Sequence, residues 1–473
     1  MVKLFKIKKT LIPILILFSI ISTSAIGYST NTSSNSTLKN ENNLLKTTSF
    51  SYNIIIPDDY PTIQQGIDNA KPGESIFVKS GIYKENLIVD IQNLCIIGED
   101  RSVTIIDGDK NSTKHAVEIS SENVTFKNFT VKNGWNKDEI LWDISGIRIN
   151  ASNTKIIGNI ITENRIGICT MPKTYNHIFK DNIFINDGLM FADYMYDYTM
   201  SIYDFIHVME NNTVNGKPLY YYLNTNDFTV PCDAGLVILV NCTNVTIKNL
   251  DLKDTDFSIT LAGCSNCNVS NNTINNTDGE LILFFSENNT IKNNKISNSL
   301  HGICLDYESK NNEVCHNEVS GNWIGISSIT GSKYNKIHSN KVYGNKAGIE
   351  ITTYYFPMKS HNHEVYNNQI YNNNLGIMIT EGSENISVHN NDIHNNIVGI
   401  NLRKSENNNM SKNSLSKNIF SALFSGCTKN IWNNNYWNRP RILPKPIFGF
   451  KTIGKIPIPW INFDRNPARQ PTV

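Results

Sequence analysis

The sequence predicts an all-β protein, a single-stranded right-handed parallel β-helix with three short strands in each coil and a short capping helix at its N-terminal end. The first observation behind this prediction is a phrase, Asn-x-x-Gly-Ile, that recurs down the chain. The glycines of two copies, Gly325 and Gly348, lie 23 residues apart, and Gly302 lies another 23 residues before them. A fixed period of this length indicates a repeat architecture, in which each coil packs on its neighbours.

The second observation is the pattern inside one period, residues 335–351, which have the sequence NKIHSNKVYGNKAGIEI. Three short pieces at 336–338, 341–343 and 348–351 alternate apolar with polar residues, as strands do, and none is long enough for a helix. Asn tolerates left-handed corners, and its amide can bond to the Asn of the coils above and below. We expect the glycine before the third strand to supply a backbone angle closed to most residues.

The first fifty residues are predicted to be an export signal and a linker. Residues 1–25 combine four lysines, an apolar run and small residues near Ala25, which are the parts of a secretory signal peptide, with an uncleaved anchor as the alternative. Residues 26–50 are rich in Ser, Thr and Asn and too poor in apolar residues to fold. We therefore expect a secreted or cell-surface monomer with no membrane span after signal removal.

The β-helix is predicted to extend over residues 51–430. Pro61 precedes a short amphipathic segment with Ile63, Ile67 and Ala70 on one side, and a helix here would cover the first coil and its open sheet edge. Around residues 187–230 the repeat is lost. We expect this insertion to fold over one face of the coils as a flap or shallow wall.

Residues 431–473 form a tail rich in proline and aromatic residues. Four of its aromatic side chains are expected to pack on the last coil and close the core: Trp432, Tyr436, Trp437 and Trp460.

Three segments carry a resemblance to a known family: the opening YPTIQQGIDNAKPGESIFVKSGIYKENLIV, the NxI and NxxGI coils, and NNTVNGKPLYYYLN at 211–224. They resemble the NosD-like proteins of the pectin-lyase-type right-handed β-helix superfamily, and the tail is similar to that of archaeal surface members. The resemblance covers nearly everything from residue 51 onward. It implies the fold and leaves the activity open, because the family is named for an accessory role in copper-enzyme maturation.

The formal net charge of +1 gives no reason to expect nucleic acid or an anionic membrane as a partner. Asn-x-Ser/Thr sequons recur, so an exported form could be glycosylated. The expected partner is a polysaccharide or another cell-envelope glycan.

Candidate catalytic residues follow from the strand alternation. If Ile303 and Leu305 point into the coil, Asp306 points outward, and Glu350 and Arg403 fall on the same outer face. Asp306 and Glu350 would lie about 10 Å apart, two coils at the strand spacing, against roughly 6.5–9.5 Å between the carboxyl groups of inverting glycosidases. The alternative is a set of scattered, solvated polar side chains.

Two interruptions of the repeat supply candidate glycan-binding residues, because long loops on a rigid scaffold often bind ligands and exposed rings stack on sugars. The candidates are Tyr354, Tyr355, Phe356, Asp193, Tyr194 and Asp197.

Histidines are frequent in the C-terminal half. Cys315 and His338 would lie one coil apart, close enough to share a soft metal ion, and His361 and His363 could join a site on their loop. Solvated or hydrogen-bonded histidines are the alternative. No cofactor is assigned, and calcium and copper are the ions left open.

Cys242 and Cys264 fall at matching corners of adjacent coils, within the Cα distance of a disulfide, with stacked free thiols as the alternative.

Three function classes remain open: a non-catalytic surface protein that binds carbohydrate or builds the envelope, a polysaccharide lyase or hydrolase, and a NosD-like accessory protein for a copper enzyme.

Overall fold

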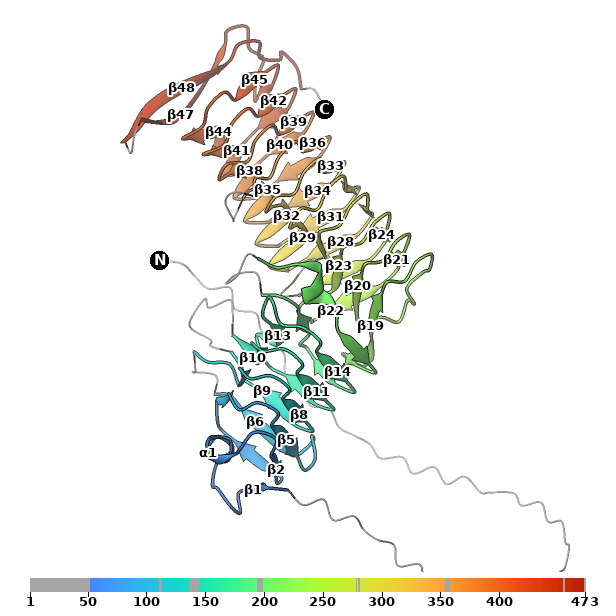
Figure 1. Cartoon of the computed structure of the whole chain (residues 1–473). Coiled ribbons are helices and arrows are strands. Elements are labelled where there is room, and N and C mark those ends of the chain that lie inside the picture. The colour runs from blue at the N-terminus through green and yellow to red at the C-terminus, as the bar shows by residue number, and fades with distance from the viewer. Residues whose placement is uncertain are drawn as a thin grey trace, which may run out of the picture. The chain divides into compact units, whose positions relative to one another are not determined.

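The computed structural model describes residues 52–109, 113–135, 144–193, 199–277, 279, 281–353, 358–453 and 456–471. Residues from Ser51 onward form one compact unit, a parallel β-helix whose strands stack coil on coil (Figure 1). The fold is the one that the sequence predicts. Among the residues described, no helix is both long and apolar enough to cross a bilayer.

The first run of coils has three parallel sheets, which we call N1, N2 and N3. N1 contains β1 (Ile54–Ile56), β2 (Ser75–Val78), β5 (Cys95–Gly98), β8 (Thr125–Lys127), β11 (Lys155–Ile157), β14 (Ile178–Lys180) and β17 (Val208–Glu210). N2 contains β3 (Gly81–Tyr83), β6 (Thr104–Asp107), β9 (Thr130–Lys132), β12 (Ile160–Thr162), β15 (Ile183–Ile185) and β18 (Thr213–Val214). N3 contains β4 (Leu87–Val89), β7 (Val117–Ile119), β10 (Ser145–Ile149), β13 (Ile166–Thr170) and β16 (Leu189–Met190).

The second run also has three sheets, C1, C2 and C3. C1 contains β19 (Lys217–Leu223), β20 (Leu236–Val240), β23 (Ile259–Ala262), β26 (Leu281–Phe284), β29 (His301–Asp306), β32 (Ile324–Ser328), β35 (Ala347–Ile351), β38 (Leu375–Thr380), β41 (Val398–Arg403), β44 (Phe420–Ser425) and β47 (Lys445–Ile453). C2 contains β21 (Thr246–Lys248), β24 (Asn268–Ser270), β27 (Thr290–Lys292), β30 (Glu313–Cys315), β33 (Lys336–His338), β36 (Glu364–Tyr366), β39 (Ser387–His389), β42 (Asn409–Ser411), β45 (Ile431–Asn433) and β48 (Ile456–Asp464). C3 contains β22 (Asp251–Lys253), β25 (Thr273–Asn275), β28 (Lys295–Ser297), β31 (Glu318–Ser320), β34 (Lys341–Tyr343), β37 (Gln369–Tyr371), β40 (Asp392–His394), β43 (Ser414–Ser416) and β46 (Tyr436–Trp437).

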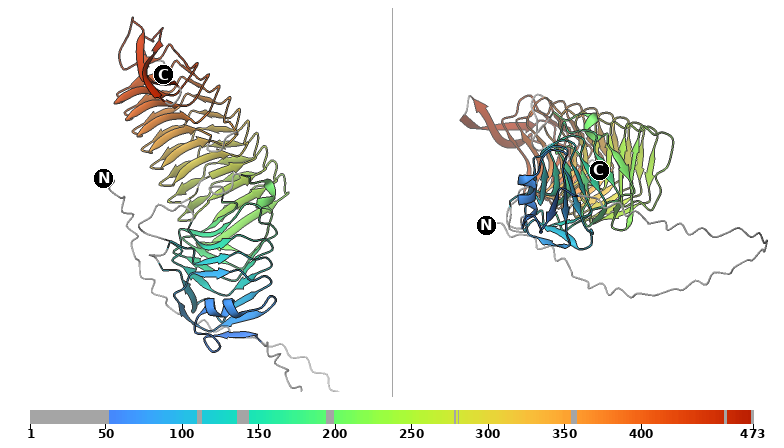
Figure 2. Two further views of the ribbon diagram at one scale, coloured as in Figure 1. Left: turned by 60° about the vertical axis from the view of Figure 1, so that its left-hand side comes forward. Right: turned by 60° about the horizontal axis from the view of Figure 1, so that its bottom comes forward.

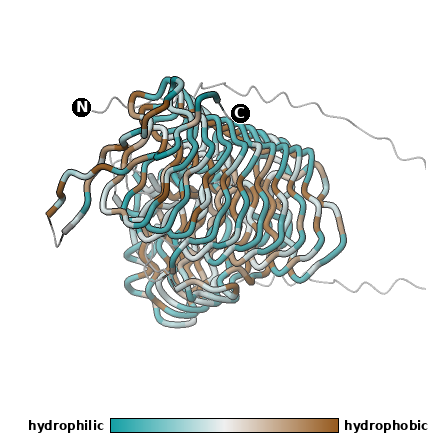
Figure 3. Tube along the Cα trace, turned by 90° about the horizontal axis from the view of Figure 1, so that it is seen from above, coloured by the Kyte–Doolittle hydropathy of each residue, from teal (hydrophilic) through white to brown (hydrophobic). Residues whose placement is uncertain are grey.

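The three strands predicted within residues 335–351 are confirmed as β33, β34 and β35. Their inward side chains, such as Ile337, Val342 and Ile349, are fully buried and stack on the equivalent residues of the next coil. Figure 3 shows this regularity, since apolar positions recur at the same place in successive coils of the second run.

Buried asparagines hold the corner between C2 and C3 together. The backbone N–H and the side-chain Nδ2 of Asn317 both donate to Oδ1 of Asn340 in the next coil, at 2.9 and 3.0 Å. Nδ2 of Asn317 also donates to the carbonyl of Ile291 in the preceding coil, at 2.9 Å. The same bonds repeat along a ladder that contains Asn272, Asn294, Asn317, Asn340, Asn368, Asn391, Asn413 and Asn435.

The asparagines of the recurring Asn-x-x-Gly-Ile phrase form a second ladder at the corner that precedes C1, from Asn322 through Asn345, Asn373 and Asn396 to Asn418. The predicted bonding between coils is therefore confirmed, and it satisfies corner groups that have no access to water.

An aspartate replaces asparagine at the last rung of two ladders. Asp464 accepts from the N–H and Nδ2 of Asn435, at 2.9 and 3.1 Å, and from the indole of Trp437 at 2.9 Å. Asp187 ends a shorter ladder at the corner that precedes N3, where it accepts from the backbone N–H and Nδ2 of Asn164, at 3.2 and 2.9 Å.

The glycine of the repeated phrase is required for a reason other than the predicted one. Gly325, Gly348 and Gly376 do not adopt a left-handed backbone. Instead, a Cβ atom on Gly348 would lie 2.6 Å from the carbonyl oxygen of Gly376 in the next coil. Close approach between coils, and not backbone angle, therefore excludes a side chain there.

Helix α1 (Ile63–Asn69) lies against β1, β2 and β4 at the start of the first run. Thr62 caps it by accepting the N–H of Gln65 at 3.2 Å, and Ile63 and Ile67 are buried beneath it.

A hairpin between β18 and β19 joins the two runs. The segment before it, which includes the 3-10 helix η1 (Ile202–Phe205), packs across the outer face of C1. Phe205 contacts Phe284 of that face with ring centroids 5.1 Å apart, and Phe191 and Met200 belong to the same buried cluster. This contact gives part of C1 a covered outer face.

The chain ends in an antiparallel hairpin of β47 and β48 that projects from the coils (Figure 2). Trp432 and Trp437 are buried at the last coil, as expected, and Tyr436 is half-buried. Trp460 was expected to join them, but it lies exposed on the hairpin because β48 pairs with the last coil only at Asp464.

We expect Asn340→Ala to destabilise the second run by about 2 kcal/mol, because it leaves the N–H of Asn317 and the carbonyl of Val314 buried without their partner. Hydrogen exchange of the amides in β30 to β36 would measure the loss. Asn374→Ala, at an exposed corner position next to a ladder residue, is the matched control. Equal effects of the two substitutions would contradict the structural role of the ladder.

Candidate functional site

The outer columns of C1 follow the predicted register. Cys304, Ser327, Glu350, Met378 and Asn401 pair in succession on neighbouring strands. The adjacent outer column includes Asp306, next to Phe284 of the preceding coil, and further along it Thr380 lies beside Arg403.

The predicted catalytic group does not form a surface site. Asp306 and Glu350 are buried, and they lie in different columns as well as two coils apart. Arg403 is exposed and pairs with Glu381, with Nε and Oε1 3.4 Å apart. Asp306 is buried because the outer face of C1 is covered at this point. Phe284 and Ile329, which lie beside Asp306, belong to a buried apolar cluster with Phe205.

Burial raises the pKa of Asp306 to about 7, although the N–H of Tyr307 donates to its Oδ1 at 2.7 Å and lowers it. A carboxyl group with this pKa could serve in acid–base chemistry, but here no polymer on the surface can reach it.

Asp193 was a candidate for glycan binding, and the structure buries it in an ion pair. Its Oδ2 lies 3.1 Å from Nη1 of Arg148, and both side chains are almost fully enclosed. Asp193 is therefore not a surface residue. The other five candidates lie outside the described residues: Tyr194, Asp197, Tyr354, Tyr355 and Phe356.

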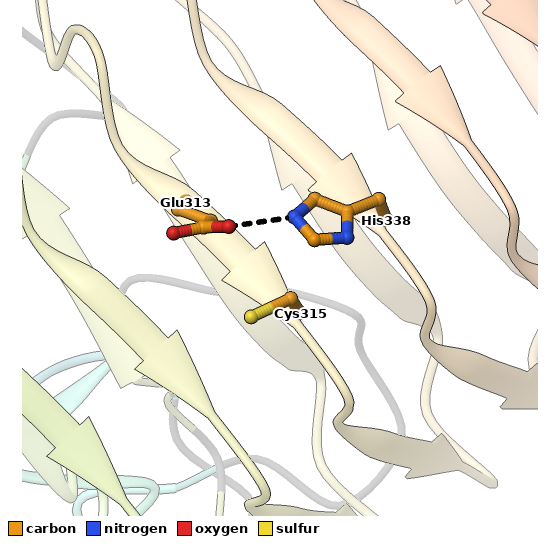
Figure 4. A group of neighbouring side chains, drawn as sticks. All are labelled: Glu313, Cys315 and His338. Atoms are coloured by element: carbon orange, nitrogen blue, oxygen red, sulfur yellow. Dashed lines mark hydrogen bonds and ion pairs between the residues drawn. The ribbon is translucent and has the colours of Figure 1, made fainter.

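The outer face of C2 brings Cys315 and His338 side by side, as the sequence predicted, because they pair on β30 and β33. Glu313 completes the group, with its Oε1 2.7 Å from Nε2 of His338 (Figure 4). One donor atom from each of the three residues lies within 4.8 Å of the others. Sequence reasoning missed Glu313, although its place two residues before Cys315 puts it on the same strand face.

The chemistry of these three donors fits a soft or borderline metal ion, since thiolate, imidazole and carboxylate are all metal ligands. Burial first, and the charge of Glu313 second, raise the pKa of the Cys315 thiol. A bound cation would offset both effects by favouring the thiolate. Nδ1 of His338 lies 3.2 Å from the hydroxyl of Ser339, which orients the ring with Nε2 toward the other donors.

His361 and His363 do not join this group. His363 is buried in an asparagine ladder, where its Nδ1 accepts the N–H of Asn335 at 3.2 Å, and its Nε2 lies 2.9 Å from the Ser360 hydroxyl. Burial lowers the pKa of His363 to about 3. The structure does not bring these two histidines to Cys315 and His338. His363 takes the place of a ladder asparagine, and His361 lies beside Tyr334 at the same corner, which precedes β36.

Two stacks of rings lie on the outer faces of C2 and C3, in the same three coils. On C2, Tyr366 stacks between His338 and His389, with ring centroids 4.6 and 5.1 Å apart. On C3, Tyr371 stacks between Tyr343 and His394, at 5.0 Å from each. All six rings are partly exposed, and the ladder of Asn340, Asn368 and Asn391 lies between the two stacks.

Sequence reasoning missed the C3 stack, although Tyr343, Tyr371 and His394 occupy the same position of successive repeats. Each ring follows the inward Val or Ile of its strand. Equivalent positions of consecutive coils lie one strand spacing apart, and this periodicity could have identified the stack.

Cys242 and Cys264 are free thiols, so the predicted disulfide is not present. The two lie at adjacent corners, but their thiols donate to backbone carbonyls, Cys242 to Tyr222 at 3.5 Å and Cys264 to Leu239 at 3.4 Å. The structure therefore has the stacked thiols that were the alternative. Cys267 belongs to the same buried cluster.

Residues 195–356 match the family model described as periplasmic copper-binding protein (NosD). Over these residues the parallel β-helix is NosD-like. The matched segment contains Glu313, Cys315 and His338, and most of it belongs to the second run of coils. No relative among the curated proteins matches this chain.

Solved structures with a similar chain path include the A-module of the mannuronan C-5 epimerase AlgE4 of Azotobacter vinelandii, which is 12% identical, with 79% of this chain and 89% of that chain covered and a TM-score of 0.37. The polygalacturonase of Erwinia carotovora ssp. carotovora is 12% identical, with 77% and 92% covered and a TM-score of 0.34. The Dettilon tailspike protein is 12% identical, with 67% and 60% covered and a TM-score of 0.31.

The buried Asp306 should make stability fall as pH rises. Its pKa is about 7 in the folded chain and about 3.9 when unfolded, so its stabilising contribution is complete below the lower value and is lost as pH rises through the higher one. We expect Asp306→Asn to match the natural chain in melting temperature near pH 4 and to exceed it at pH 8, by roughly 4 kcal/mol of stability.

Thermal melts across this pH range test the prediction. Asp251→Asn, an exposed carboxylate on C3, is the control and should leave the profile unchanged. A constant offset between Asp306→Asn and the natural chain at every pH would show that Asp306 is not protonated on folding.

Proposed function

We propose that the chain is an exported, non-catalytic β-helix protein that binds a polysaccharide or another cell-envelope glycan along the outer faces of C2 and C3. The observation that carries the proposal is the pair of ring stacks, which repeat in the same three coils on adjacent sheets. The rings are partly exposed and repeat at the coil spacing of about 4.8 Å. A sugar unit of an extended glycan is of similar length, so successive units could meet successive coils.

Polar side chains beside the stacks add hydrogen-bonding groups at the same spacing. Glu318 accepts from the hydroxyl of Tyr343 at 2.7 Å, and Lys341 lies beside that ring at 5.1 Å from its centroid. On C2, Glu313, Lys336 and Glu364 pair in succession on neighbouring strands. A surface of partly exposed rings and alternating charges suits a polar, flat-faced ligand such as a sugar chain.

A lyase or hydrolase is the weaker alternative because the predicted catalytic residues do not form a site on the surface. Acid–base cleavage needs carboxyl groups that flank the scissile bond. Asp306 and Glu350 are buried, and Arg403 is engaged by Glu381 at the surface. The binding function needs no such group.

We expect immobilised protein to retain at least one acidic or neutral polysaccharide and to release no shortened or unsaturated oligosaccharide by mass spectrometry. Combined Tyr366→Ala and Tyr371→Ala substitutions should weaken retention about tenfold, since each removes the central ring of a stack. Tyr203→Ala, which removes an exposed ring elsewhere, is the control. Cleavage products would establish an enzyme, and unchanged retention in the double variant would remove the ring stacks from the binding surface.

The donor cluster on C2 favours a second function, the binding of a copper ion by Glu313, Cys315 and His338. We propose this on the geometry of the three donors, and it agrees with the match of residues 195–356 to a family of periplasmic copper-binding proteins. A thiolate and an imidazole are ligands that suit Cu(I), and copper binding would place the chain with accessory proteins of copper enzymes.

Competition with a coloured Cu(I) chelator under reducing conditions would measure this affinity. We expect Cys315→Ser to weaken binding more than tenfold, and affinity of the natural chain to rise with pH, because burial raises the pKa of the thiol that must lose its proton. Cys95→Ser is the matched control, a half-buried thiol on N1 whose strand neighbours are Ser75 and Thr125. Equal binding by the natural chain and Cys315→Ser would exclude the cluster.

A further inference from the structure

The C-terminal hairpin presents an apolar face that no described residue covers. Phe448 pairs across the strands with Ile461, Pro446 with Phe463, and Phe450 with Pro459. These residues alternate with others along each strand, so they share one face of the hairpin. The exposed fractions are 58% for Phe448, 48% for Phe450, 44% for Ile461 and 49% for Phe463.

Neighbouring residues extend this apolar surface. Ile442 and Leu443, just before β47, are among the most exposed large apolar side chains of the described chain. On the opposite face of the hairpin Trp460 is also exposed, with Nζ of Lys451 4.9 Å from its ring centroid. The hairpin projects away from the coils (Figures 1 and 2), although Ile447, on the same face as Trp460, is buried against the core. Soluble proteins rarely expose contiguous apolar surface of this kind without a binding role.

The same segment is strongly basic. From Arg439 to the end of the chain, the only acidic side chain is Asp464, which is buried in the last rung of its ladder. None of the described basic residues of this tail forms an ion pair with another described residue: Arg439, Arg441, Lys445, Lys451, Arg465 and Arg469. Burial first, and then the cations Arg441 and Arg439, lower the pKa of Lys445. Positive charge is therefore crowded and without a nearby carboxylate.

The near-zero net charge of the full chain conceals this arrangement. The chain has 43 basic and 42 acidic residues, so a basic tail implies a net acidic remainder. This uneven distribution of charge indicates that the tail can bind an anionic partner, although the net charge of the whole chain gave no reason to expect one.

We propose that the C-terminal hairpin docks on an anionic lipid surface. Phe448, Phe450, Ile461 and Phe463 would enter the boundary between headgroups and acyl chains, and Arg439 and Arg441, which precede β47, would lie among the headgroups. Interfacial membrane binding depends on this combination of a buried apolar face and basic residues around it. Each basic residue near such a surface contributes about 1 kcal/mol, and aromatic residues favour the interface.

A second copy of the chain is a less suitable occupant, for two reasons on the hairpin itself. Two hairpins packed face to face about a twofold axis would bring like charges together. Pro457 and Pro459 have no N–H to offer an added strand, and prolines in strands occupy positions whose N–H would face outward. The free edge of β48 is therefore poorly suited to pair with another strand.

Sedimentation of the full chain with vesicles tests the proposal. We expect it to bind vesicles of phosphatidylcholine mixed with phosphatidylglycerol, to bind pure phosphatidylcholine at least tenfold more weakly, and to dissociate as salt is raised. Combined Phe448→Ser and Phe463→Ser should lower affinity at least tenfold, as should combined Arg439→Gln and Arg441→Gln. The second pair keeps the proposal testable if the first disturbs the hairpin, which melting curves would show.

Combined Ile82→Ser and Ile419→Ser is the matched control, because it removes two exposed apolar side chains elsewhere, 64% and 73% accessible, and should bind as the natural chain does. Binding unaffected by both hairpin variants, or no binding to either vesicle, would overturn the proposal. So would concentration-dependent dimers in lipid-free solution that the hairpin variants abolish, since the apolar face would then serve a second copy.

Discussion

Hydrogen bonds between stacked asparagines are the interaction on which this structure depends. A β-helix must turn its chain three times in every coil, and each turn buries backbone groups that no sheet partner satisfies. The side-chain amide of Asn317 satisfies three such groups: it accepts the N–H of Asn294 and donates to the carbonyls of Ile291 and Cys315. Oδ1 of Asn340 in the next coil accepts in turn from the backbone N–H and Nδ2 of Asn317. Because the bonds link equivalent residues, they also fix the register of each coil on the next.

That register is what places the candidate sites. Cys315 and His338 meet only because β30 and β33 stack without slippage, and the ring stacks on C2 and C3 depend on the same alignment through three coils. A shift of one residue would turn every outer side chain into the core. The sites therefore need no long-range positioning beyond the ladder itself, and all their residues lie on strands.

The periodic part of the structure could be predicted from the sequence, and the aperiodic part could not. Repeat spacing identified the strands of residues 335–351, the outer columns of C1 and the approach of Cys315 to His338. It could not show that Asp306 is buried, because that depends on where the segment around Phe205 folds, and this segment has no repeat. His363 was predicted to lie on a loop for a related reason. The insertion in its coil hides the repeat, so the sequence does not show that His363 takes the ladder position next to Asn335.

The last rungs of two ladders have a consequence for growth of the stack. An asparagine accepts from the coil below and donates to the coil above, so a ladder of asparagines is a polar chain that could in principle be extended without limit. Asp187 and Asp464 accept in the same way, but an aspartate side chain has no amide N–H with which to donate to a further coil. The ladder of side-chain hydrogen bonds therefore ends at each aspartate. A coil of another molecule stacked beyond Asp464 would find an acceptor in this side chain but no donor.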